Sequence, residues 1–525
     1  EYDVDVSGGS KVFNYYLGIG SLNQEGIVLG TDYKQHSVLL NTTYNLSDKI
    51  SITTGVNYQS KQSSGAWNYQ NVLSRSVTMP FTYRYTYEDG TPAPGEGVAS
   101  FRNRNHEVYY KEQYNDVKVY RTTLNLGVDW KIMKGLTFRP AVYYFTTEGK
   151  ENYFEAYNEV NPNRNASAVH NFDKQLQADG VLNYDKSIGK NHNFNAVLGT
   201  SYIEQYAYRM SGSGSGAPTD YITTLNASAD STKRITTTET TEKMISLFGR
   251  VSYDYKRKYM LSFSLREDGS SRFAEDNQFG LFPGVSAGWN IHKENFWKPL
   301  SNIASTFKLR SSWGQTGNND LSLANTRGAY TTNNNYGGEP GILNTTLPNR
   351  TLVWETTTSF DLGLDMGFWN NRVSLLLDYY RKVTSDRIFS KPLDATSGFS
   401  SITSNYGSIL NEGFEIELSA TPVRTKDITW DVNFNFANNA ALVLKLPDNG
   451  KLKNRIGGNQ VYNKATKSYE YVGGTAEGER FGERWAYHLI GVYATDEDAA
   501  GAPYDVEAGG RKKVGGDAIW EDVDG

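Results

Sequence analysis

Cysteine is absent from this 525-residue chain, which excludes disulfide bonds and thiolate metal sites within it. Long apolar runs are absent too, because no stretch approaches the roughly 18 residues that a membrane-spanning helix needs. The six histidines are scattered, without the His-x-x-x-His spacing of a zinc site. The 53 basic and 58 acidic residues are spread evenly, and a chain without a basic stripe is an unlikely match for nucleic acid. These absences leave open a protein built from strands.

Alternation of apolar and polar residues is the dominant pattern that the chain does show. Apolar residues occupy every second position of 360–368, and polar residues or glycines fill the positions between them. Segments 414–420 and 428–436 repeat the pattern on either side of a short turn. A period of two places one set of side chains on each face of a sheet. About fifteen such strands of roughly ten residues or more can be counted, and that is the length with which a tilted strand crosses a bilayer.

Turn lengths alternate along the chain as well. Short turns join the two strands of each hairpin, whereas long polar segments join one hairpin to the next, and aromatic residues cluster near the short turns. The long segments are 60–119, 149–172, 209–243, 317–352 and 444–480. The clustered rings are Tyr44, Trp130, Tyr184, Tyr255, Tyr259, Phe368, Trp369 and Trp430. Short turns at one end, long loops at the other and an aromatic girdle are typical of bacterial outer-membrane barrels.

A soluble sandwich or propeller is the alternative explanation of the alternation, with the apolar face as its core. Soluble sheets more often use strands of about five or six residues, so the long strands favour a barrel in lipid. We therefore predict an all-β fold, a large transmembrane antiparallel β-barrel with long extracellular loops and short periplasmic turns. A barrel of this size is either a porin-like channel or a plugged transporter.

Several long phrases of the sequence resemble one known family. They are YYLGIGSLNQEGIVLGTDYKQHS near the start, LREDGSSRFAEDNQFGLFPGVSAGWNI at 265–291, KLRSSWGQTGNNDL, WETTTSFDLGLDMGFWNNRVSLLLDYYRKVTSD and ILNEGFEIELSATPV. In this order they are similar to the barrel of the SusC/RagA-like family of TonB-dependent outer-membrane transporters. The resemblance runs from about residue 2 to the end of the chain.

The resemblance implies a 22-stranded barrel in the bacterial outer membrane, surrounded by its lipid, with an N-terminal plug inside. It also implies a TonB-contacting segment that couples the barrel to TonB, ExbB and ExbD, and a SusD-like lipoprotein that caps the extracellular mouth. Such pairs import oligosaccharides or, in some members, peptides, and often form dimers of barrel–lid pairs. We expect residues 1–525 to be a partial barrel domain, with the signal, TonB segment, plug and last strands outside it. An enzyme is not expected, because no catalytic constellation is visible.

Two alternatives to active import stay open on the sequence. An adhesive barrel at the cell surface would lack both plug and TonB segment, and a passive porin-like barrel would conduct ions without a plug. The residues that precede this chain would separate the three readings.

Polar residues of the inward register are the first group of candidate site residues. In a barrel they face the lumen, where they contact substrate, hydrogen-bond to the plug or hold water. The predicted lumen-facing residues are Arg250, Arg266, Arg310, Asp361, Asp365, Glu415 and Glu417.

Two loops supply the second group of candidates. Rings stack on sugar faces and amides pair with hydroxyl groups, so loops that combine them suit glycans; the same residues suit contact with a lid protein or simple loop packing. The predicted substrate-binding residues are Trp67 and Tyr69 in one loop, and Tyr330, Asn333, Asn334 and Tyr336 in the other.

A calcium loop is the one metal site that the sequence hints at. Asp522 and Asp524 alternate before Gly525, as the first ligands of such a loop do. The chain contains no closing carboxylate after them. We expect no other cofactor.

Overall fold

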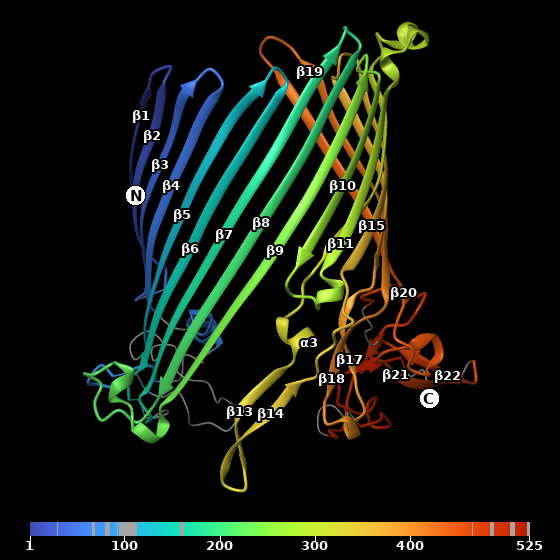
Figure 1. Cartoon of the computed structure of the whole chain (residues 1–525). Coiled ribbons are helices and arrows are strands. Elements are labelled where there is room, and N and C mark those ends of the chain that lie inside the picture. The colour runs from blue at the N-terminus through green and yellow to red at the C-terminus, as the bar shows by residue number, and fades with distance from the viewer. Residues whose placement is uncertain are drawn as a thin grey trace. The chain divides into compact units, whose positions relative to one another are not determined.

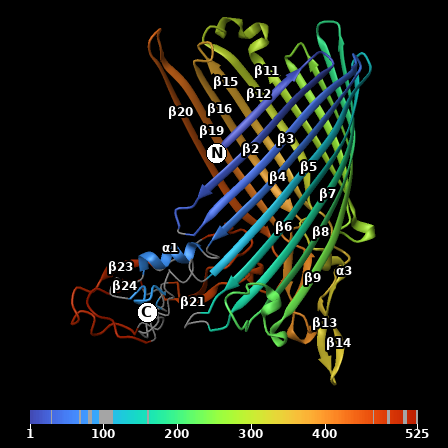
Figure 2. The ribbon, with the colours of Figure 1, turned by 90° about the vertical axis from the view of Figure 1, so that its left-hand side faces the viewer.

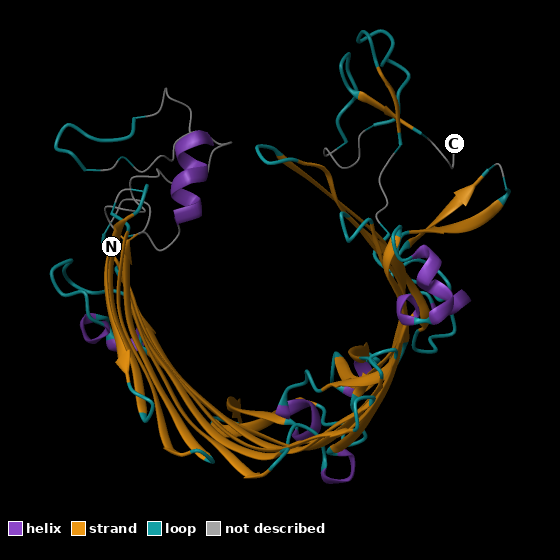
Figure 3. Ribbon diagram, turned by 90° about the horizontal axis from the view of Figure 1, so that it is seen from above, coloured by secondary structure: helices purple, strands orange, loops and turns teal. Residues whose placement is uncertain are grey.

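The computed structural model describes residues 1–28, 30–65, 69–78, 84–91, 93, 113–157, 162–464, 466–483, 488–504 and 510–521. Strands dominate these residues and the helices are short (Figure 3). The helices are α1 (Tyr69–Thr78), α3 (Leu323–Arg327) and the 3-10 turns η1 (Leu225–Ala227), η2 (Asp230–Thr232), η3 (Glu275–Asn277), η4 (Ile291–Lys293), η5 (Asn295–Leu300), η6 (Ala395–Ser397) and η7 (Leu452–Asn454). Among the described residues, no helix is both long and apolar enough to cross a membrane.

One antiparallel sheet of 16 strands contains most of the chain (Figure 1). Neighbouring strands of the sheet follow one another in the sequence, and the small strands of the loops are not part of it. The strands are, in order, β1 (Tyr2–Gly9), β2 (Phe13–Glu25), β3 (Asp32–Ser47), β4 (Ile50–Gly65), β5 (Gln113–Met133), β6 (Leu136–Glu155), β7 (Asn165–Ile188), β8 (His192–Gly214), β9 (Arg234–Tyr255), β10 (Tyr259–Ser270), β11 (Phe279–Asn290), β12 (Ala304–Asn318), β15 (Glu355–Phe368), β16 (Val373–Ser385), β19 (Ser408–Arg424) and β20 (Thr429–Lys445).

Among the described residues, four two-stranded sheets lie outside this one. They are β13 (Ala329–Tyr336) with β14 (Glu339–Thr346), β17 (Ile388–Pro392) with β18 (Ser401–Asn405), β21 (Asn459–Asn463) with β22 (Ser468–Val472), and β23 (Leu489–Val492) with β24 (Ala518–Trp520). All of them belong to segments that follow the long-loop ends of the sheet strands.

The chain divides into two compact units, the first made of residues 1–256 and 262–281 and the second of 257–261 and 282–525. In the first unit the long strands β2 to β9 run side by side (Figure 2). Pairing here is extensive, and β7 and β8 stay in register from Ala166↔Gly214 to Ile188↔His192.

One face of the sheet carries continuous rows of apolar residues. In the second unit a row of directly paired apolar residues crosses five strands, from Leu309 through Leu364, Leu377 and Ile416 to Phe436. Rings and aliphatic chains on this face are exposed; Phe436, for example, keeps 44% of its surface free. A soluble sandwich would bury such a face, so its exposure is the signature of a surface that lipid covers.

The apolar band has a defined height along the strands. On β8 it runs from Phe194 to Tyr202, where the Tyr202 hydroxyl donates to Glu204 at 2.7 Å and Lys243 pairs with the same carboxylate at 3.3 Å. Eight residue steps of about 3.3 Å span about 26 Å along the strand. At a strand tilt of about 40° this length covers about 20 Å across the membrane, most of the apolar band of about 25 Å in outer-membrane barrels.

The most deeply buried side chains lie near the long-loop ends of the strands. The largest fully buried side chains among the described residues are Phe154, Phe273, Leu352 and Val443, which lie at or near the long-loop ends of the strands. Phe154 packs with Ala156, Ala166 and Ala217 there.

The predicted fold class is confirmed, with sixteen strands in the main sheet where the sequence indicated about fifteen. The strands are longer than predicted, because β8 and β9 continue through 209–214 and 234–243, which alternation assigned to a loop. Beyond the apolar band both faces are polar, so alternation ends while backbone pairing continues, as in the Ser211↔Thr236 pair. The segments 317–352 and 444–480 were likewise predicted as loops and contain α3, β13–β14 and β21–β22.

Candidate functional site

An ion-pair network lies on the polar face of the second unit. The Arg310 guanidinium donates from Nε to Asp365 Oδ1 at 2.8 Å and from Nη2 to Asp378 Oδ2 at 2.6 Å. Lys308 Nζ lies 3.5 Å from Asp365. Gly363 stands between these groups, and a Cβ there would collide with the guanidinium. The glycine therefore makes room for an arginine that bridges two strands.

The other predicted residues of this face differ in their bonding. Asp361 accepts a long hydrogen bond of 3.4 Å from the Ser312 hydroxyl. Glu415 and Glu417 are exposed, and no described residue hydrogen-bonds or pairs with either carboxylate. Glu415 lies directly across from Asp378 in the β16–β19 register. The face therefore combines a neutralised cluster with carboxylates that are free to bind.

The two predicted arginines of the first unit are both held by neighbours. Arg266 donates from Nε to Asp268 at 2.8 Å and from Nη2 to the Ser246 hydroxyl at 2.9 Å, with its guanidinium 5.2 Å from the centre of the Phe248 ring. Arg250 donates from Nε to the Ser262 hydroxyl at 2.9 Å. These contacts position the arginines within the sheet.

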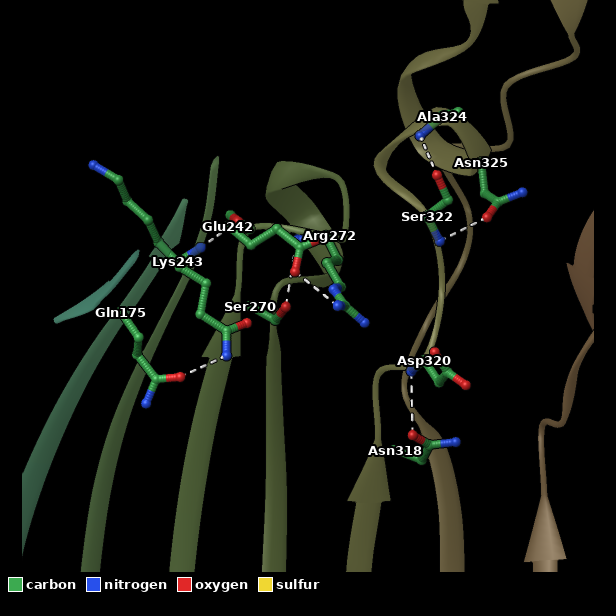
Figure 4. A network of polar contacts seen from close by, with 12 residues as sticks. Gln175, Glu242, Lys243, Ser270, Arg272, Asn318, Asp320, Ser322, Ala324 and Asn325 are labelled. Atoms are coloured by element: carbon green, nitrogen blue, oxygen red, sulfur yellow. Dashed lines mark hydrogen bonds and ion pairs between the residues drawn. The ribbon is translucent and has the colours of Figure 1, made fainter. Parts of the chain in front are cut away.

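A hollow of about 420 Å³ opens on the polar face of the first unit, toward the long-loop end. Gln205 donates to Gln175 at 3.0 Å inside it. Glu242 in its wall pairs with Arg272 at 2.7 Å (Figure 4). Residues that line it are Phe145, Asp173, Lys174, Gln175, Gln205, Tyr206, Ala207, Thr240 and Glu242. The hollow combines an aromatic ring with amides and charges.

None of the hollow's residues was among the predicted site residues. Gln175 and Gln205 face each other in the β7–β8 register although 30 residues separate them in the chain. In the sequence, the two glutamines are marked only by their position in the polar register, which alternates with apolar residues such as Leu176. Polar residues occupy that register in every strand, so alternation alone does not single these two out.

Asparagine side chains organise the connection between β12 and β15 in the second unit. Asn405 donates to the Val353 and Asp386 carbonyls at 2.8 and 2.7 Å, and accepts from the Val353 amide at 2.7 Å. Asn349 donates to the Thr403 carbonyl at 2.9 Å. These bonds tie the connection to the β17–β18 hairpin beside the buried Leu352.

Near the start of the same connection, the N-terminus of α3 is capped by side chains. The Asp320 amide donates to the Asn318 side chain at 3.1 Å, and the Ser322 hydroxyl accepts from the Ala324 amide at 3.3 Å (Figure 4). Asn325 closes the cap by accepting from the Ser322 amide at 2.9 Å. Caps of this kind satisfy backbone groups that would otherwise lack partners.

Beyond α3 the chain forms the β13–β14 hairpin (Figure 1), which carries one predicted group of substrate-binding residues. Tyr330 and Tyr336 keep 64% and 87% of their surface exposed. Asn334 donates to the Thr331 carbonyl at 3.2 Å, which makes it part of the hairpin bulge. The two rings are thus available for contact, whereas this amide supports the turn.

The remaining predicted residues lie in α1, in β13 or outside the described residues. Tyr69 begins α1 and Asn333 lies in β13, but the orientation of neither side chain is described. Trp67, Asp522 and Asp524 lie outside the described residues, so the calcium loop stays a prediction. Within the described ranges, no group of three or more histidine, aspartate or glutamate residues could hold a metal ion.

An ion pair joins two loops of the first unit. The Arg164 guanidinium donates from Nε to Asp220 Oδ1 at 2.7 Å and from Nη2 to Oδ2 at 3.2 Å. This bidentate bond, helped by the Tyr157 amide, holds the pKa of Asp220 below its ordinary value. The lowered pKa keeps this carboxylate charged, and the ion pair between the two loops intact, at more acidic pH than an ordinary aspartate would allow.

Comparison with known proteins agrees with this architecture. The family described as "TonB dependent receptor-like, beta-barrel" matches residues 66–520. The chain is 30% identical over 510 residues to TonB-dependent receptor P39 of Formosa agariphila, covering 96% of this chain and 47% of that protein. It is 27% identical over 490 residues to TonB-dependent receptor SusC of Bacteroides thetaiotaomicron, covering 85% of this chain and 47% of SusC.

Solved structures show the same fold. The RagAB peptide transporter matches with a TM-score of 0.78 at 22% identity, over 99% of this chain and 57% of that one. The ferripyoverdine receptor of the Pseudomonas aeruginosa outer membrane matches with a TM-score of 0.51 at 11% identity, over 90% and 61%. The chain spans about half the length of the curated relatives it matches. It belongs to the TonB-dependent receptor family of bacterial outer-membrane β-barrel proteins.

Proposed function

We propose that the full-length protein imports oligomeric nutrients across the outer membrane with energy delivered through TonB, ExbB and ExbD. A SusD-like lipoprotein caps its extracellular mouth. The observation that carries the proposal is a sheet of sixteen strands with one apolar, exposed face and one polar face that bears a hollow and free carboxylates. In a barrel of this family the polar face lines the lumen.

Segments outside this chain supply, in this proposal, what import needs beyond the sheet. The outer strands of the sheet, β1 and β20, each have one neighbour in it. In lipid an unpaired strand edge leaves backbone groups without partners, so we propose that further strands close the barrel. A plug and a TonB-contacting segment are further proposed parts of the full-length protein.

Oligosaccharides are the proposed substrate class. The hollow places the Phe145 ring beside the Gln175 and Gln205 amides, and the outer hairpin exposes Tyr330 and Tyr336. Rings cover the apolar faces of sugars, while amides exchange hydrogen bonds with their hydroxyl groups. Peptides are the second candidate class, favoured by the exposed Glu415 and Glu417, which could pair with basic side chains.

Purification of the full-length protein from solubilised outer membranes tests the proposed assembly. Every chain that co-purifies in gentle detergent would be identified by mass spectrometry. Recovery of a SusD-like lipoprotein in stoichiometric amount supports the capped importer. Recovery of the barrel alone in good yield would favour an adhesin or a passive porin, and single-channel conductance would then separate these two.

The purified complex also tests the hollow. We expect Gln175→Ala combined with Gln205→Ala to weaken oligosaccharide binding about tenfold, because each lost hydrogen bond contributes about 0.5–1.5 kcal/mol. Calorimetric titration with an oligosaccharide series and a peptide series would measure the binding affinity of each variant. Asn435→Ala, an exposed amide on β20 of the second unit, is the matched control. Unchanged affinity in the double variant would remove the hollow from the substrate path.

A further inference from the structure

One short-turn connection of the second unit is unlike the others. β15 and β16 are joined by residues 369–372, and β19 and β20 by 425–428. The connection between β11 and β12, by contrast, contains residues 291–303 and two 3-10 turns, η4 and η5. Two paired strands can be joined by about four residues, as in the other two connections. The additional residues of this connection therefore need another explanation.

The connection folds back against the apolar face of the sheet. The Trp297 ring lies 4.6 Å, centre to centre, from the Phe307 ring, and its Nε1 donates to the Ala304 carbonyl at 3.0 Å. Phe307 shares the apolar face with Leu309, two residues along β12. The turn η5 therefore lies at the border of the surface that lipid covers.

Glu294 fastens the connection from the other side. Its carboxylate accepts from the Tyr259 hydroxyl at 2.6 Å, from Lys258 Nζ at 2.9 Å and from Trp289 Nε1 at 3.2 Å. The hydrogen bond from Tyr259 and then that from Lys258 lower the pKa of Glu294 to about 2. Because Tyr259 and Trp289 belong to the apolar face, the charged carboxylate anchors the turn to its aromatic border.

The exposed side chains of this turn include both apolar and basic residues, and we call this group the turn patch. Its apolar members are exposed: Phe296 by 63%, Leu300 by 47%, Ile303 by 53% and the neighbouring Trp369 by 54%. The Trp369 amide donates to the Ile303 carbonyl at 2.7 Å, which joins the two turns. The basic members Arg257, Lys293 and Lys298 are also exposed, and Lys293 Nζ donates to the Arg257 carbonyl at 3.1 Å.

We infer that the turn patch is a lipid-binding anchor that inserts its apolar side chains into the periplasmic leaflet and holds anionic phospholipid headgroups with its basic ones. Short turns of outer-membrane barrels lie on the periplasmic side. The patch continues the lipid-covered face, and an interfacial segment with apolar and basic residues together suits an anionic lipid surface. The acidic side chain within the connection, Glu294, is already paired. This inference does not depend on the substrate or on transport.

Spin labels on the full-length protein test the anchor. The chain has no cysteine, so Phe296→Cys and, separately, Leu300→Cys introduce a single labelling site into it. The protein would be placed in nanodiscs of phosphatidylethanolamine with phosphatidylglycerol. Collision of each label with oxygen, which partitions into lipid, and with a water-soluble nickel chelate would be compared by power saturation. Lys190→Cys, exposed in the short β7–β8 turn, is the matched control.

Labels at 296 and 300 are expected to collide preferentially with oxygen, while the label at 190 collides preferentially with the chelate. Equal chelate access at all three positions would place the turn in water and overturn the anchor. Protection at 296 and 300 from both reagents would also overturn it, since a protein surface would then cover the patch.

A second arm tests the headgroup contact. Lys293→Gln combined with Lys298→Gln in the Phe296→Cys protein is expected to raise chelate access at 296 in the anionic nanodiscs. Neutral phosphatidylcholine nanodiscs are expected to have the same effect on the protein with both lysines intact. Identical access in all these samples would exclude a role of the basic residues in lipid binding.

Discussion

Among single residues, Gly363 has the most direct effect on the polar face. Its missing Cβ leaves the space that the Arg310 guanidinium occupies between Asp365 and Asp378. We expect Gly363→Ala to push the guanidinium away from its two carboxylates and to destabilise the folded protein by about 1 kcal/mol, the scale of a partly exposed ion pair. Urea unfolding of the full-length protein in lipid vesicles would measure the change.

Gly249→Ala is the control for this prediction. It lies in another strand of the sheet, and its Cβ would meet no atom closer than 3.6 Å. Equal stability of the two variants would show that Arg310 has room to rearrange. A loss confined to Gly363→Ala would confirm that the bridge between the strands depends on the glycine.

Among the elements, the connection that contains η4 and η5 is held to the sheet by the carboxylate of one residue, Glu294. The pKa of Glu294 falls from 4.5 to about 2 because its charged form accepts three hydrogen bonds in the folded protein. Its stabilising contribution is therefore complete above about pH 4.5, decreases as the pH falls below that value and is lost below about pH 2.

The measurement is the temperature at which a label at position 296 becomes mobile, in the otherwise native protein and in Glu294→Gln. We expect the native protein to hold the label to higher temperature above pH 4.5 and this advantage to shrink as the pH falls toward 2. A difference that stays constant across that range would mean that Glu294 acts by its shape and not by its charge.

For the whole molecule, the decisive property is that the two faces of one sheet meet different solvents. A charge in the middle of the apolar row should therefore cost far more than one on the polar face. We expect Leu364→Lys, in the row that runs from Leu309 to Phe436, to destabilise the protein in vesicles by about 2–4 kcal/mol. Ser359→Lys on the polar face of the same strand is the control.

Urea titration of both lysine variants, followed by the mobility difference between folded and unfolded barrel on gels, would show the effect. If Leu364→Lys were as stable as Ser359→Lys, the apolar row would not be in contact with lipid. The apolar face would then have to be covered by protein.

The sequence by itself determined the fold class, the identity of the two faces and the alternation of short turns with long loops. These depend on side-chain periods and turn lengths, which are local properties of the chain. The phrase-level resemblance to the SusC/RagA-like family agreed with the comparisons for the same reason, since it rests on local runs of residues.

Only the tertiary structure decided which polar residues act together. Arg310 meets Asp378 across 68 positions and Gln175 meets Gln205 across 30, because register and strand order bring them together. It also decided where strands end, since backbone pairing continues past the apolar band where both faces are polar. The folded loops and the turn patch were also decided by the tertiary structure, because they arise from contacts between segments that no local pattern specifies.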